Sequence, residues 1–96
     1  MRGDADMNDH PQAPLADAPP ADDRVTVYDR EHLKLYMRLL DADSEGAPLS
    51  EIARILLGID AAAEPERARR VHDNHLERAR WMTEHGYRDL LSKGLP

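Results

Sequence analysis

The clearest apolar pattern lies in the middle of the chain. It recurs at i, i+3, i+4, i+7 and i+8, and its members are Leu49, Ile52, Ala53, Leu56 and Leu57. This spacing predicts a helix over residues 49–57 with one buried face. Pro48 suits the first helical position, where its missing N–H has no partner in any case, and Gly58 suits the position after the helix end.

A second apolar pattern precedes it. We expect Asp29 to cap a helix that runs to about Leu40. Its expected core positions are Leu33, Tyr36, Met37 and Leu40. We expect residues 25–28 to form an extended lead-in and the acidic residues 41–46 to form a linker.

The third pattern predicts the longest helix, from about Pro65 to His85, with Gly86 as its stop. A helical wheel places one set of residues on its core side: Ala68, Val71, His75, Ala79 and Met82. Asp73 and Asn74 are weak helix formers, so a break there is conceivable. A short fourth helix is expected over residues 87–91, with Tyr87, Leu90 and Leu91 facing the core.

The predicted fold is therefore all-α. It is a small helix-turn-helix-like bundle of three main helices plus a short C-terminal helix, over residues 24–96. Residues 1–23 contain four of the seven prolines and few apolar positions. Because such a composition buries little surface, we expect these residues to form a disordered N-terminal tail.

Composition narrows the function classes. The chain has no Cys, no apolar run long enough to span a membrane, and no secretory h-region near its start, so we expect a cytoplasmic protein. It lacks a Gly-rich phosphate loop and a nucleophile elbow, so we expect no enzyme, no cofactor and no small-molecule ligand. His72 and His75 share a helical face, but without a clear third ligand we expect them to edge the core and predict no metal site.

Charge is unevenly distributed. The formal net charge is -6, yet residues 67–96 carry net +3. A strip of the long helix, off its apolar face, consists of Arg67, Arg70, Asn74, Arg78 and Trp81. This strip could be a solvated face, a protein-binding surface or a DNA-reading surface, and the acidic remainder of the chain disfavours DNA. Trp81 could pack against residues 86–91 or anchor an interface.

Two motifs flank this strip. They are Glu51-Ile52-Ala53-Arg54-Ile55-Leu56-Leu57-Gly58 before it and Gly86-Tyr87-Arg88-Asp89-Leu90-Leu91 after it. With an Arg-rich helix between them, the chain resembles the RovC-like DNA-binding domain family over about residues 25–92. The resemblance implies a helix-turn-helix fold and a role in transcription control. Longer members of this family activate secretion systems or the excision of mobile elements, whereas short stand-alone members include QseM-type antiactivators.

The chain is similar to that short class, so we expect an antiactivator that binds and inhibits transcriptional activator proteins. The expected setting is quorum sensing, or excision or transfer of a mobile genetic element. We predict Arg70, Asn74, Arg78 and Trp81 as the partner-binding residues, with weak or no nucleic-acid binding. Two alternatives stay open, a sequence-specific DNA-binding regulator and a structural or toxin–antitoxin-like accessory protein.

Overall fold

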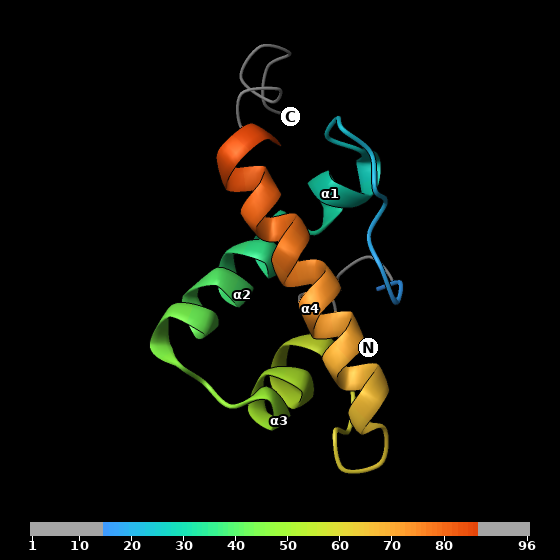
Figure 1. Ribbon diagram of the computed structural model, residues 1–96, viewed down its shortest axis with the longest axis vertical. Helices are drawn as coiled ribbons and strands as arrows, with labels where there is room; N and C mark the ends of the chain where they lie inside the picture. Colours follow the sequence, from blue (N-terminus) through green and yellow to red (C-terminus); the bar gives the residue numbers. More distant parts are fainter. Residues whose placement is uncertain (1–14, 87–96) are drawn as a thin grey trace, which may run out of the picture.

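The computed structural model describes residues 15–86, and within them the chain is helical without any strand. The helices are α1 (Val27–Glu31), α2 (Leu33–Glu45), α3 (Leu49–Ile52) with the π-helical continuation η1 (Ala53–Leu57), and α4 (Pro65–Trp81) with the π-helical continuation η2 (Met82–Gly86). The long helix α4 packs on both α2 and α3 (Figure 1). The prediction of a small all-α bundle is confirmed. The expected short helix at residues 87–91 lies outside the described residues.

The middle helix forms as its apolar pattern predicts. α3 and η1 together span Leu49–Leu57, and Gly58 ends them at a φ of 69°, a left-handed conformation that glycine adopts at little cost. Ile52 and Ala53 are buried, at 4% and 0% exposure. Pro48 precedes the helix instead of occupying its first position.

The predicted core face of α4 is also confirmed. All five expected residues are buried, namely Ala68, Val71, His75, Ala79 and Met82. The helix continues through Asp73 and Asn74, so the conceivable break there does not occur. A continuous α4 of 17 residues gives the bundle its central element.

The start of the bundle differs from the prediction. Asp29 does not cap a following helix, because Thr26 caps α1 and Asp29 lies in the first turn of α1. Residues 27–28, expected to be extended, are helical. α2 then runs on to Glu45 and ends at Gly46, with a φ of 73°, so most of the predicted linker at residues 41–46 belongs to this helix.

The core positions predicted for this helix are correct except at Met37, because Tyr36 is buried, and Leu33 and Leu40 are partly buried and pack on the core. α2 buries Leu35, Tyr36 and Leu39 against the core, whereas Met37 is 56% exposed. The chain turns at His32 between α1 and α2, and His32 is itself buried. The prediction missed Leu35 and Leu39, which share the buried side of this helix with Tyr36.

The segment of residues 15–24, which we call the arm, lies against the helices (blue and cyan in Figure 1). Leu15 packs on the main core, and the backbone N–H of Ala16 donates a hydrogen bond to the Tyr28 hydroxyl at 3.0 Å. The prediction of a disordered tail is thus wrong for residues 15–23. Composition could not reveal this packing, since it depends on partners about 50 residues away in the sequence. Residues 1–14 lie outside the described part of the chain.

Ile52 provides a test of this packing. Ile52→Ala removes a side chain that is 4% exposed, so we expect the free energy of unfolding to fall by about 2–5 kcal/mol. The matched control is Ile55→Ala, three residues further along, where Ile55 is 58% exposed and the expected change is within about 0.5 kcal/mol. Urea unfolding measures both, and equal losses in the two variants would contradict the packing described.

Candidate regulatory interface

One face of α4 carries most of the residues predicted to bind a partner. Arg67, Arg70, Asn74 and Trp81 follow at spacings of three, four and seven residues, which places them along one side of the helix. All four are partly or largely exposed. We call these four residues the α4 strip.

Arg78 is not part of this surface, although it was predicted to be. Its side chain is 7% exposed and forms a two-pronged ion pair with the fully buried Asp29, from Nε to Oδ1 at 2.9 Å and from Nη2 to Oδ2 at 2.6 Å. The expectation that Arg78 points away from the core is wrong. The physical reason is α1, which places a carboxylate directly opposite this position of α4.

Asp29 is held by several donors at once. Besides Arg78, its carboxylate accepts hydrogen bonds from the Tyr36 hydroxyl at 2.8 Å and from the Thr26 backbone N–H at 2.9 Å. Burial by itself would raise the pKa of Asp29, but the bonds from Arg78, Thr26 and Tyr36 outweigh it and lower that pKa. The Thr-x-x-Asp spacing of residues 26–29 is a capping-box signal from which this helix start could have been predicted.

The remaining donors of Arg78 hold the arm. Nη1 donates to the carbonyl of Asp22 at 2.6 Å, and Nη2 donates to the carbonyl of Arg24 at 2.9 Å. The guanidinium also lies over the Trp81 ring, 4.0 Å from its centroid, at a distance suited to a cation–π contact. Arg78 therefore positions both the arm and Trp81 without being exposed itself.

Asp17 of the arm pairs with the basic end of the α4 strip. Its carboxylate accepts hydrogen bonds from Arg67 Nε at 3.2 Å and from Arg70 Nη2 at 3.3 Å. These two bonds lower the pKa of Asp17. Because the three side chains are between 41% and 53% exposed, solvent and salt weaken the attraction. The pair nevertheless offsets much of the positive charge that this end of α4 would otherwise present.

A groove separates the rest of the arm from α4. It measures about 510 Å³, and it is lined by residues 18–23 of the arm and by Asn74, Glu77, Arg78 and Trp81 of α4. The Trp81 ring also stacks on His85, with ring centroids 5.9 Å apart. The alternative in which Trp81 packs on residues 86–91 concerns residues that lie mostly outside the described part of the chain.

His75 is connected to the beginning of the arm through the hydroxyl group of Tyr28. Its Nδ1 lies 2.8 Å from the Val71 carbonyl and must donate to it, so Nε2 accepts from the Tyr28 hydroxyl at 2.6 Å. That hydroxyl in turn accepts the N–H of Ala16. His72 instead contacts Asp73 at 2.8 Å, so the two imidazoles have separate partners. Among the described residues, no group of three or more His, Cys, Asp or Glu side chains could hold a metal ion.

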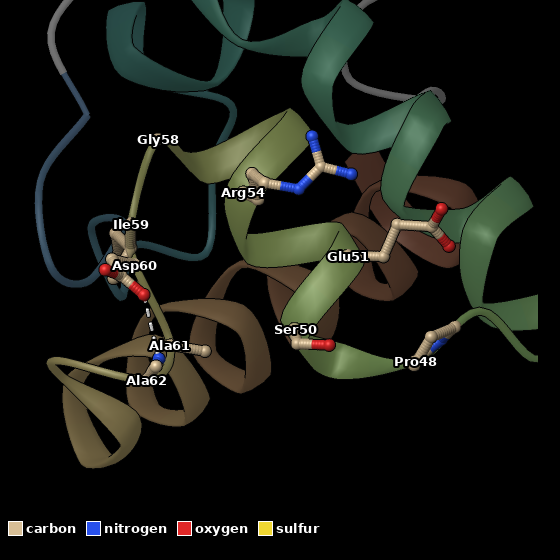
Figure 2. A pocket seen from close by; sticks show the side chains of 9 residues that line it. All are labelled: Pro48, Ser50, Glu51, Arg54, Gly58, Ile59, Asp60, Ala61 and Ala62. Atoms are coloured by element: carbon tan, nitrogen blue, oxygen red, sulfur yellow. Dashed lines mark hydrogen bonds between the residues drawn. The ribbon is translucent and has the colours of Figure 1, made fainter.

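A second concave surface lies beside α3. Residues of α3, of η1 and of the loop that leads to α4 line a groove of about 770 Å³. Figure 2 shows Ser50, Glu51 and Arg54 on one side and the loop residues on the other. Asp60 closes the loop by accepting the backbone N–H of Ala62 at 2.9 Å. Every polar side chain lining the groove is exposed, among them Ser50, Glu51 and Arg54. The groove contains none of the predicted site residues.

A model of a known protein family matches most of the chain. Residues 5–92 match the model of the RovC DNA-binding domain, which is described as "T6SS, Transcription factor, DNA binding domain". No curated protein matches the chain. No helix in the described residues is both long and apolar enough to cross a membrane.

The buried ion pair predicts that replacing either of two nearby arginines will change the free energy of unfolding by very different amounts. Arg78→Ala leaves Asp29 buried without its cation, so we expect unfolding to become easier by about 3–5 kcal/mol. Arg80→Ala is the matched control, since Arg80 is 56% exposed and pairs with Asp43 at the surface, a contact worth at most about 1 kcal/mol. Chemical denaturation of both variants measures the two losses in unfolding free energy. Similar small losses would show that Asp29 and Arg78 are not paired as described.

His75 predicts a pH dependence. Burial lowers the pKa of His75, so below the unfolded value of about 6.5 the unfolded chain binds more protons than the folded one. Stability should therefore fall as the pH drops from 7.5 to 5.5, with a contribution of at most about 1.4 kcal/mol per pH unit from this group. His75→Gln should flatten the slope of unfolding free energy against pH in this range. An unchanged slope would rule out this assignment.

Proposed function

This chain belongs to the RovC family of transcription-factor DNA-binding domains, and we propose that it acts as an antiactivator, a protein that binds a transcriptional activator and blocks it. The partner would dock on the α4 strip. The observation that carries the proposal is the pairing of Arg67 and Arg70 with Asp17, because this carboxylate partly neutralises two cations that phosphate binding would use. Transcription control as such follows from the family.

Charge elsewhere supports the same proposal. A DNA-reading helix normally presents unpaired cations on a basic protein, whereas this chain has a formal net charge of -6. Arg78, which could have added a further cation, is buried in its pair with Asp29. Electrostatic repulsion from DNA phosphates would therefore weaken association along this face.

The α4 strip has the composition of a protein-binding surface. Trp81 offers a large aromatic area that few rotatable bonds need to order, and Arg70 and Asn74 add directed hydrogen bonds. Trp and Arg are the residue types most often found to dominate interface energies. Arg78 contributes indirectly, by holding the Trp81 ring in place.

The cellular setting is proposed from the resemblance to QseM-type antiactivators. Such a protein would act in the cytoplasm and would control quorum sensing, or the excision or transfer of a mobile genetic element. No catalytic chemistry is part of this proposal.

A second candidate is a sequence-specific DNA-binding regulator, which the family description favours. In that case Arg70 would read guanine and Asn74 would read adenine from the major groove. A gel shift over a salt series separates the two candidates. The antiactivator proposal predicts weak, non-specific binding that vanishes near physiological salt, and a nanomolar, sequence-selective shift would replace it with the second candidate.

The partner can be sought among activators encoded near the gene, by a two-hybrid screen followed by binding of the purified proteins. We expect at least one of them to bind the chain directly and to lose promoter activation when the chain is present. A failure of every such activator to bind would speak against the antiactivator role.

Once a partner is known, charge reversal locates the surface. Arg70→Glu, at a side chain that is 53% exposed, should leave the fold intact and weaken partner binding at least about fivefold, or more than about 1 kcal/mol. Arg38→Glu makes the same charge change on the exposed face of α2 and should have little effect. The helicity of both variants is checked first, and isothermal titration then measures their affinity for the partner. If both variants bind the partner with the same affinity, the interface lies elsewhere.

A further inference from the structure

We infer that the α4 strip, with the donors of Arg78 beside it, is a docking surface for an acidic, extended, proline-bearing segment of a protein partner, and that the arm covers this surface in the free chain as a competitor. The groove between the arm and α4 is the part of this surface that the arm leaves open. The inference rests on the proposed function, because it names the chemistry of the segment with which an activator would bind. The arm already binds this face of α4 in the free chain. Its contacts with α4 could equally be made by a segment of another protein.

The first contact recognises a carboxylate. Arg67 and Arg70 approach the two oxygens of Asp17 from successive turns of α4, at 3.2 Å and 3.3 Å. One carboxylate between two guanidinium groups is a charge-assisted arrangement with a defined position and direction. Any acidic side chain presented at this place on an extended backbone would satisfy the same two donors.

The second contact recognises an extended backbone. Arg78 donates to the carbonyl oxygens of Asp22 and Arg24, at 2.6 Å and 2.9 Å. Carbonyl groups of any sequence could accept these bonds, provided the segment stays extended as it passes α4. Between this contact and the carboxylate, Pro19 and Pro20 line the groove together with Trp81. Because proline rings favour an extended chain and lose little entropy when bound, they suit such a groove.

The groove suits a peptide better than a nucleic acid. Glu77 is exposed and lines the groove beside Trp81, and Asp73 is exposed on the preceding turn of α4. A run of phosphates along α4 would meet these carboxylates after passing Arg67 and Arg70, whereas a peptide needs only one acidic residue at the Arg pair. Charge complementarity is thus confined to one point, and the remainder of the groove offers an aromatic ring and backbone donors.

Competition from within the chain has a measurable consequence. A short tether keeps the arm at an effective concentration of about millimolar, so a partner segment must bind more tightly than the arm in order to displace it. A change that weakens only the arm should therefore tighten partner binding. Asp17→Asn removes the charge that contacts Arg67 and Arg70. Asp23→Asn removes an equal charge from an arm residue that also lines the groove, but whose side chain forms no hydrogen bond or ion pair with α4 within the described residues.

The test uses the full-length chain in three forms: the unchanged sequence, Asp17→Asn, and the control Asp23→Asn. The probe is a synthetic peptide with the sequence of residues 15–23. Its binding is monitored in NMR spectra through the amide signals of α4 and the indole signal of Trp81, the one tryptophan of the chain. We expect millimolar peptide to shift the signals of Arg67, Arg70 and Trp81 at least several-fold more in Asp17→Asn than in the other two forms. A peptide carrying Asn in place of its first Asp should not shift them.

Equal shifts in all three forms, or none in Asp17→Asn, would overturn the inference. A second experiment adds a random-sequence DNA duplex to the same samples. If the DNA binds Asp17→Asn far better than Asp23→Asn, and the peptide does not, the docking surface would be assigned to nucleic acid instead. The activator, where one has been found, should bind Asp17→Asn several-fold more tightly than Asp23→Asn. If no activator binds any form, the antiactivator proposal fails, while the peptide titration still decides whether the groove takes an acidic segment.

Discussion

The ion pair between Asp29 and Arg78 is the interaction on which the rest of this structure depends. It joins the first turn of α1 to the last turns of α4, and both side chains are buried. A buried carboxylate is stable only with its donors in place, so Thr26, Tyr36 and Arg78 must all be positioned at the same time. The pair thereby determines where α1 lies, and with it where the arm, which leads into α1, ends its path along α4.

From this constraint follows the character of the exposed face of α4. A helix with five arginines would be expected to present a basic surface, yet Arg78 is directed inward and Asp17 pairs with Arg67 and Arg70. On the α4 strip, what remains accessible is an aromatic ring, an amide and a partly neutralised pair of cations. The chain belongs to a family of DNA-binding domains, and for this face we propose a protein ligand with a chemistry like that of the arm.

The parts predicted well from the sequence are those in which local signals suffice. Pro48, Gly58 and an unbroken apolar period determined the middle helix, and the core face of α4 followed from its own spacing. The parts predicted badly are those decided by distant charges. Arg78 was assigned to the surface because its partner lies 49 residues away, and residues 15–23 were assigned to a tail because one carboxylate among prolines forms no periodic pattern.

Hydrogen–deuterium exchange of the chain, free and bound to an activator found by the screen proposed above, tests the central claim most directly. If the activator replaces the arm on α4, the amide of Ala16, which is bonded to Tyr28 in the free chain, should lose protection on binding, while amides of α4 near Arg70 and Asn74 should gain it. Protection that instead appears on α2 and α3, with the amides of the arm unchanged, would contradict the account.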